Sequence, residues 1–101
     1  MSSHAKAAAL DLAAPYRLNP SVALRPEPFG ALAYHFGNRR LSFLKAPELV
    51  ELVRELDRHP SVGHALAGVP GARRAAFRRA LASLAAADMI IPQRSGTGAP
   101  P

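Results

Sequence analysis

Residues able to perform acid–base or metal chemistry are few in this chain, and their spacing does not suit it. Histidine occurs four times, at His4, His35, His59 and His64, and cysteine does not occur. His59 and His64 are five residues apart across a Pro-Ser break, whereas i and i+4 spacing places two metal ligands on one helical face. The lack of cysteine excludes disulfides, thiolate-bound metals, iron–sulfur clusters and a thiol nucleophile. The sequence predicts no metal site and no resident cofactor.

A hydrolytic triad requires a nucleophile, a base and an orienting acid at one place, and no such set is found. Ser42 and His35 fall within one expected hairpin, but not at opposed positions, and no carboxylate is expected beside them. Most of the acidic residues alternate with arginines between positions 48 and 58, which is typical of a solvated helix face. No glycine-rich loop between a strand and a helix is present to bind a nucleotide phosphate. We expect the protein not to be an enzyme.

Arginine, in contrast, is concentrated in one segment. Four arginines crowd the first two turns of an expected helix: Arg73, Arg74, Arg78 and Arg79. Positive charge at this end opposes the helix dipole, so helix stability does not explain it. On a helical wheel Arg74 and Arg78 align with Ala82 and Ala85, which predicts a strip of small side chains headed by guanidinium groups that can hold carboxylates. The alternative interpretation is that these arginines are only solvated.

The net charge of +6 over 101 residues favours an anionic partner, such as nucleic acid, a membrane surface or an acidic peptide. A chain of this length forms one domain. The apolar residues that begin at Ala7 are interrupted by Asp11, too early for a secretory signal. No segment approaches the roughly 20 apolar residues that cross a bilayer. We expect a cytoplasmic protein that does not associate with membranes.

Strand signals come first along the chain. Gly37-Asn38 is a pair that accepts positive φ, and it stands between runs rich in aromatic and branched residues. This pattern predicts a hairpin with a two-residue loop. An earlier strand is expected at residues 22–25, ended by the prolines at 26 and 28.

The hairpin also predicts a register. Tyr34 then lies opposite Leu41, and Leu32 lies opposite Phe43. These four residues share one side of the sheet with Phe36, because directly opposed residues lie on the same face. Such sorting is expected of a three-stranded antiparallel meander with one covered face.

Helical signals follow the strands. The first helix starts at Pro47, without a good cap at Ala46, and stops at Pro60; its apolar stripe is Leu49, Leu52, Val53 and Leu56. Ser61 suits the cap of a short second helix, with an inner face of Val62, Ala65, Leu66 and Val69. A third helix is expected over residues 72–88, with a buried stripe of Phe77, Ala80, Leu81 and Leu84. Residues 89–91 are expected to pack against the core.

Strands followed by helices define an α+β fold, here a three-stranded antiparallel sheet followed by a three-helix bundle. The ends of the chain are small, polar or rich in Gly and Pro. We therefore expect the folded domain to span residues 16–92, between disordered tails at residues 1–15 and 93–101.

Residues 20–32 (PSVALRPEPFGAL), continued by YHF at 34–36 and LSFLK at 41–45, resemble the peptide-chaperone family of the mycofactocin system. That family is similar in fold to the pyrroloquinoline-quinone peptide chaperone. The resemblance covers roughly residues 16–92 and is most specific over residues 20–45. The short second helix and both ends of the chain carry little of it.

The resemblance implies a winged-helix-like peptide-recognition domain without activity of its own. Such a chaperone binds the leader of a ribosomally made precursor peptide and presents it to a radical S-adenosylmethionine maturase. In this family the precursor ends in Val-Tyr, and the maturase decarboxylates and cross-links that pair on the way to a redox cofactor. The cluster and the S-adenosylmethionine belong to the partner enzyme.

The free edge of the third strand gives this role a physical basis, because unpaired N–H and C=O groups can bind a guest strand. If the chain behaves like the family, the groove lies between that strand and the third helix. We expect the peptide to be bound by Arg40, Leu41, Ser42, Phe43, Leu44 and Lys45 from the strand, and by Arg74, Arg78, Ala82 and Ala85 from the helix.

The alternative function is nucleic-acid binding, because three short helices with a basic third helix resemble a helix-turn-helix. Two features argue against it. The strands precede the helices, whereas a winged helix carries its wing after the recognition helix. The third helix also lacks an Asn or Gln to read adenine. A third possibility is a subunit that only supports a larger enzyme.

Overall fold

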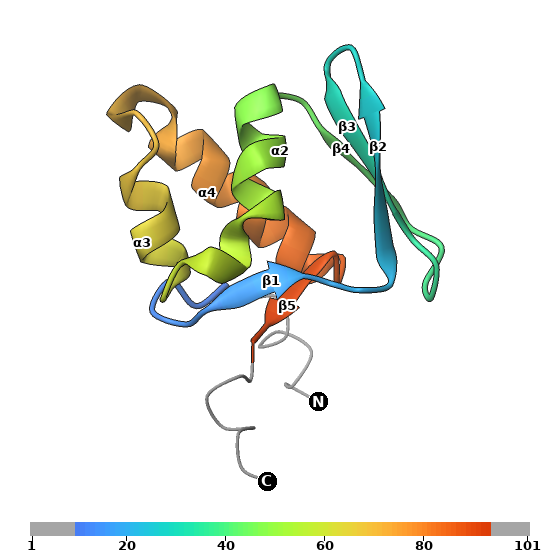
Figure 1. Ribbon diagram of the computed structural model, residues 1–101, viewed down its shortest axis with the longest axis horizontal. Coiled ribbons are helices and arrows are strands. Elements are labelled where there is room, and N and C mark those ends of the chain that lie inside the picture. Colours follow the sequence, from blue (N-terminus) through green and yellow to red (C-terminus); the bar gives the residue numbers. More distant parts are fainter. Residues whose placement is uncertain (1–9, 94–101) are drawn as a thin grey trace, which may run out of the picture.

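A three-stranded antiparallel sheet and three α-helices make up most of the structure, a computed structural model that describes residues 10–93 (Figure 1). The elements follow in the order β1 (Tyr16–Leu18), β2 (Val22–Glu27), β3 (Gly30–His35), β4 (Leu41–Leu44), α2 (Pro47–Arg54), the 3₁₀ helix η1 (Leu56–Arg58), α3 (Val62–Ala67), α4 (Gly71–Ala86) and β5 (Ile90–Pro92). Strands β2, β3 and β4 are neighbours in that order. The predicted α+β class and three-stranded meander are confirmed.

Strands β2 and β3 are joined by the two-residue loop Pro28-Phe29, because Glu27 and Gly30 are the last paired positions. Gly30 has a φ of 149°, and a Cβ there would clash with the carbonyl oxygen of Leu44. Only glycine therefore allows β4 to approach so closely. The prediction that the first strand of the meander ends before Pro26 is wrong, since β2 runs through it. Proline is tolerated there because β2 is an edge strand.

The predicted register of β3 with β4 is confirmed, with Tyr34 opposite Leu41. The predicted two-residue loop at Gly37-Asn38 is wrong. Residues 36–40 separate β3 from β4, and the hydrogen bond from the His35 N–H to the Arg40 carbonyl leaves residues 36–39 as the loop itself. The positive φ, 62°, is at Arg39. The two extra loop residues leave the register unchanged, because one is added on each side of the expected turn.

The ring of His35 supports this wider loop. Its Nδ1 accepts hydrogen bonds from the backbone N–H groups of Gly37 and Asn38, at 2.9 and 3.1 Å. The proton of the neutral ring is then on Nε2, which donates to the Asp88 carboxylate at 3.0 Å. The side chain of Asn19 donates to the same carboxylate and to the Asp88 carbonyl. This cluster of two buried side chains, His35 and Asn19, and the exposed Asp88 ties the sheet to the end of α4.

Helices cover only one side of the β2-β3-β4 sheet (Figure 1). The side chains on that side are small or deeply buried, among them Ala31, Ala33 and Leu44. The other side carries the large apolar residues, and there Leu41 is 56% and Phe43 is 59% exposed. The covered face is therefore not the face on which the sequence gathers its large apolar residues.

The helix signals are largely confirmed. Pro47 stands in the first turn of α2, and Ala46 caps it without a side-chain hydrogen bond. The regular helix ends at Arg54 and passes into η1, earlier than the predicted end at Pro60. Ser61 caps α3 as predicted, because its Oγ accepts a hydrogen bond from the N–H of His64 at 3.1 Å.

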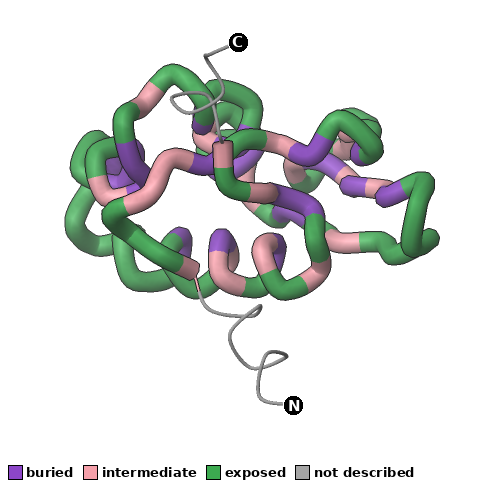
Figure 2. The backbone as a smooth tube through the Cα atoms, turned by 90° about the horizontal axis from the view of Figure 1, so that it is seen from below, coloured by how far each residue is buried: buried purple, intermediate pink, exposed green. Residues whose placement is uncertain are grey.

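The predicted apolar stripes of the helices form the core, which Figure 2 shows as buried segments gathered between the strands and helices. The buried helical residues are Leu49, Val50, Val53, Leu56, Val62, Ala65, Leu66, Phe77, Leu81 and Leu84, and Val69 is buried in the loop between α3 and α4. Leu52 and Ala80, which the sequence placed in these stripes, are half-buried at the core margin.

A second, two-stranded sheet was not predicted from the sequence. β1 pairs antiparallel with β5, so that Leu18 lies opposite Ile90. Met89 and Ile90 are buried in the core as expected, whereas Ile91 is half-buried and lies outside the core. The pairing brings the two ends of the folded chain together (Figure 1).

Residues 10–15 were assigned to the N-terminal tail, but the structure attaches them to the fold. The carbonyl of Ala14 accepts a hydrogen bond from the N–H of Val62 at 3.0 Å, and Leu10 packs against the core. Gln93, the first residue of the expected C-terminal tail, is also attached, because its N–H donates to the carbonyl of Pro15 at 2.9 Å. The remaining tail residues, 1–9 and 94–101, lie outside the described residues. Within residues 10–93, no helix is both long enough and apolar enough to span a membrane.

Candidate functional site

Strand β4 is an edge of its sheet, and no other strand of residues 10–93 pairs with its outer side. In an antiparallel pair, alternate residues exchange hydrogen bonds with the partner, and those between point away from it. The N–H of His35 donates to the carbonyl of Arg40 at 3.0 Å, which fixes the phase of this alternation. Ser42 then faces β3, and Leu41 and Phe43 direct their N–H and C=O groups to the open edge.

Beside this edge, a groove of about 320 Å³ lies between the segment that follows β4 and helix α4. It is lined by Lys45, Ala46, Leu49, Ala72, Arg73, Ala76, Phe77 and Ala80. Alanines on the α4 side leave room for a chain to approach closely. Leu49 and Phe77 are buried and give the groove an apolar floor. The groove can accept small or apolar side chains.

Two cationic side chains line the groove. Lys45 and Arg73 both line it, and the Arg73 guanidinium lies 5.3 Å from the centroid of the Phe77 ring. Nη1 of Arg73 is 3.0 Å from Oε1 of Glu48 on α2. A hydrogen bond from the backbone N–H of Glu48 and the Arg73 guanidinium hold the pKa of this carboxyl below its ordinary value of 4.5. A carboxylate ligand would therefore compete with Glu48 for Arg73, whereas Lys45 forms no ion pair within residues 10–93.

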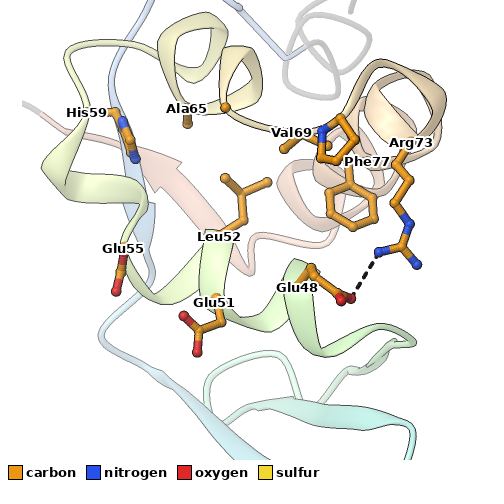
Figure 3. Close-up of a pocket in the computed structure, with 11 residues that line it drawn as sticks. Glu48, Glu51, Leu52, Glu55, His59, Ala65, Val69, Arg73 and Phe77 are labelled. Atoms are coloured by element: carbon orange, nitrogen blue, oxygen red, sulfur yellow. Dashed lines mark ion pairs between the residues drawn. The ribbon is translucent and has the colours of Figure 1, made fainter.

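A second cavity, of about 370 Å³, lies between α2, α3 and α4 (Figure 3). Glu48, Glu51 and Glu55 follow one another along its α2 side, and the apolar side chains drawn between the helices include Leu52 and Val69. Arg73 and Phe77 line both this cavity and the groove beside β4. The two sites therefore share a wall but differ in charge, because carboxylates line the second cavity.

The structure brings the predicted strand residues together at the β4 edge. Arg40 precedes β4 and Lys45 follows it, and both are exposed. The side chains of Leu41 and Phe43 point to the open face of the sheet, and that of Ser42 is half-buried on the other side. Leu44 is fully buried in the core, so its side chain cannot contact a guest chain.

The predicted helix residues are not brought to the groove. Arg74 donates to the carbonyl oxygens of Leu66 and Val69 at 3.1 and 2.8 Å, at the end of α3. Arg78 lines a separate depression with it. Ala82 and Ala85 are half-buried farther along α4. The residues of α4 that face the groove lie on the opposite side of the helix from this strip.

Arg73, Ala76 and Ala80 were not recognised as site residues from the sequence. A signal for them exists, because Arg73 lies one turn before the buried Phe77 on the same helix face. If Phe77, rather than the Arg74–Arg78 pair, is taken to border the site, the helix geometry predicts Arg73, Ala76 and Ala80 as its neighbours. The partner of Arg73, Glu48, lies 25 residues earlier on another helix and gives no local signal.

Two of the four histidines, His35 and His64, make hydrogen bonds that serve local structure. His35 belongs to the cluster with Asp88, and Nδ1 of His64 is 2.7 Å from Oγ of Ser61. His59 is half-buried at the acidic cavity, and His4 lies outside the described residues. Among residues 10–93, no group of three or more His, Asp or Glu side chains is arranged to hold a metal ion.

The helix-turn-helix interpretation needs free arginines on α4. One of the four arginines in its first two turns, Arg74, is engaged inside the domain, because it donates to the carbonyl oxygens of Leu66 and Val69. The charge available on this helix for phosphate contacts is thus smaller than the sequence suggests. The geometry favours a peptide groove over a nucleic-acid surface.

Comparison with known proteins supports the same interpretation. Residues 15–91 match the model of the peptide chaperone MftB family. The chain is 47% identical over 93 residues to the peptide chaperone MftB of Mycobacterium ulcerans, which covers 90% of this chain and 85% of that protein. It is 49% identical over 79 residues to the peptide chaperone MftB of Mycolicibacterium smegmatis (76% and 78%), and 44% identical over 82 residues to that of Mycobacterium tuberculosis (79% and 75%). No solved structure matches the chain significantly, so the winged-helix likeness stays a prediction. With a match over most of its length, the chain belongs to the peptide chaperone MftB family, a family of chaperones and not of enzymes.

Proposed function

We propose that this chaperone binds the leader of a ribosomally made precursor peptide as an added strand on β4 and presents it to a radical S-adenosylmethionine maturase in mycofactocin biosynthesis. The observation that carries the proposal is the open edge of β4 beside the groove against α4. The names of the relatives support a peptide as the ligand.

The backbone of β4 supplies the affinity in this proposal. Leu41 and Phe43 offer two N–H donors and two C=O acceptors at the edge. A guest strand that pairs with them satisfies groups that otherwise bond only to water. Such main-chain pairing fixes the direction and register of the guest, and its sequence is read by the side chains around it.

The groove supplies the specificity. Side chains alternate along a strand, so every second residue of the guest points toward α4. Ala76 and Ala80 leave space there for small or apolar side chains, and Lys45 and Arg73 attract a carboxylate. Arg73 exchanges its bond to Glu48 for one to the peptide. The leader is therefore expected to combine small apolar residues with at least one acidic residue.

The maturase supplies the chemistry. The chain has no cysteine, so an iron–sulfur cluster held by thiolates has to belong to the partner. The role of this chain is to hold the leader in an extended form, which removes the ordering cost from the encounter with the enzyme.

Strand addition can be tested with two substitutions at one position. Phe43→Pro removes the outward N–H without breaking a bond to β3, whereas Phe43→Ala removes the same ring and keeps the N–H. Fluorescence polarisation with a synthetic, labelled precursor peptide ending in Val-Tyr measures both. We expect Phe43→Pro to bind about tenfold more weakly than Phe43→Ala, because a main-chain hydrogen bond is lost and the proline ring obstructs the edge.

Circular dichroism and urea unfolding identify whether each variant is folded. Equal affinities for folded Phe43→Pro and Phe43→Ala would contradict strand addition at β4. Tight binding of duplex DNA that weakens steeply with salt, without peptide binding, would favour the helix-turn-helix alternative instead.

A further inference from the structure

The uncovered side of the β2-β3-β4 sheet carries most of the aromatic residues of the protein. The chain has four phenylalanines and two tyrosines. Three of the phenylalanines are exposed, Phe29 by 40%, Phe36 by 62% and Phe43 by 59%. The core is meanwhile built largely from alanine, valine and leucine. Exposure of large apolar side chains to water is unfavourable, and a patch of this kind marks an interaction site.

These residues form one continuous surface, which we call the aromatic face. Its members are Phe29, Leu32, Tyr34, Phe36, Leu41 and Phe43. The rings of Phe29 and Phe43 have centroids 5.8 Å apart, and those of Tyr34 and Phe36 meet edge to face at 5.1 Å. The surface is therefore ordered in the free protein, so a partner does not have to arrange the rings on binding.

Arginines lie at the rim of the aromatic face. Arg39 is exposed in the loop between β3 and β4, at one end of this face. Arg25 lies on the same side of β2, opposite Leu32, and pairs with Glu27 at 3.2 Å. A second copy of the chain would bring these cations against their own equivalents, on molecules that each carry a net charge of +6. The complementary occupant is a different protein, with an apolar centre and carboxylates around it.

We infer that the aromatic face is the docking surface for such an acidic protein partner, which under the proposed function is the maturase. This inference rests on the proposed function only for the identity of the partner. It also explains how a bound leader is presented. A guest strand on β4 extends the sheet by one strand, so its outward side chains lie beside Leu41 and Phe43. A partner on this face then contacts the chaperone and the leader on one surface.

The test uses Phe29→Ser and Phe36→Ser together in the full chain, since neither residue belongs to the proposed peptide site. Leu12→Ser is the matched control, because Leu12 is the large apolar residue that is exposed away from this face, by 38%. Biolayer interferometry measures binding to the purified maturase, and fluorescence polarisation measures binding to the Val-Tyr precursor peptide. We expect the double variant to lose about tenfold or more in affinity for the maturase, as aromatic interface residues typically do. Its affinity for the peptide should be unchanged, and the control should behave as wild type in both assays.

Three results would overturn the inference. The first is a folded double variant that binds the maturase like wild type. The second is a wild-type dimer in sedimentation velocity that becomes a monomer in the double variant, which would assign the face to a second copy. The third is flotation of the wild type, but not the double variant, with vesicles of phosphatidylglycerol and phosphatidylcholine, which would assign it to a membrane.

The same data separate this inference from the proposed function. If the wild type fails to bind the precursor peptide and the double variant still loses the maturase, the docking surface stands and peptide capture falls. If peptide binding holds and the double variant keeps the maturase, capture stands and the docking surface falls.

Discussion

The two faces of the β2-β3-β4 sheet are built in opposite ways. The face under the helices carries Ala31 and Ala33, which are 0% and 1% exposed, together with the buried Leu44. The open face carries Phe43 and Leu41, both more than half exposed. Neighbouring residues of one short strand, Phe43 and Leu44, therefore differ completely in environment. The larger side chain is the one in water.

On β3 the two alanines face the helices, whereas the large side chains of Leu32 and Tyr34 lie on the open face. Small residues on β3 let α2 approach the sheet closely, and the buried contacts come from the helices and from Leu44. Large rings on the same face would hold the helices away. The apolar character of the open face is thus unnecessary for folding, which is why we assign it to binding.

The largest effect should come from comparing the two faces at adjacent positions. Leu44→Ala removes a fully buried side chain and leaves a cavity, so it should lower the free energy of unfolding by about 2–5 kcal/mol. Phe43→Ala removes a larger side chain from the open face and should cost less than about 1 kcal/mol, mainly its ring contact with Phe29. Urea unfolding measures both.

The two variants serve as controls for each other, because they remove bulk from consecutive residues of one strand. Comparable losses at the two positions would mean that the open face is covered in solution. Sedimentation velocity would then show whether a second copy of the chain covers it.

The reverse substitution gives the next largest effect. Ala33→Leu forces extra bulk between the sheet and the helices and should destabilise the fold by about 1–3 kcal/mol. Ala23→Leu adds the same bulk to the open face, since Ala23 is exposed and lies opposite Tyr34, and should change stability by less than about 0.5 kcal/mol. Thermal unfolding of the two variants compares them directly. A stable Ala33→Leu protein would argue against close approach as the reason for the covered face.

The comparison of faces also marks what the sequence could predict. Side-chain alternation gave the register of β3 with β4 correctly, because only one register gathers the large residues on one side. Side-chain alternation does not determine which face of the sheet the helices cover when both faces carry apolar residues. The loop type was missed because the His35 ring, not a glycine, satisfies the loop N–H groups, and that interaction depends on the position of the ring in the fold.

Contacts between distant segments escaped prediction for a related reason. β1 and β5 are three residues each and lie at opposite ends of the described chain, so no local pattern connects them. The free β4 edge followed from the strand order and was predicted. The side of α4 that faces the groove was not, because Arg74 is held by backbone carbonyls of α3 and Arg73 takes its place at the site.

The smallest effect concerns the ion pair between Glu48 on α2 and Arg73 on α4, which lies among the helices that cover the sheet. The pKa of Glu48 is lowered, so its ionised form stabilises the fold above the ordinary value of 4.5, and this contribution is lost as the pH falls through the lowered pKa. Glu48→Gln should therefore be slightly less stable than wild type near neutral pH and equal to it in strong acid.

Glu51→Gln is the matched control, because Glu51 lies one turn along α2 and forms no ion pair within residues 10–93. Thermal unfolding across this pH range, at low and high salt, measures the difference, and added salt should reduce it because both partners are exposed. A stability difference between wild type and Glu48→Gln that stays constant down to strong acid would show that the ion pair with Arg73 is not its source. Arg73 could then bind a peptide carboxylate without first breaking a bond to Glu48.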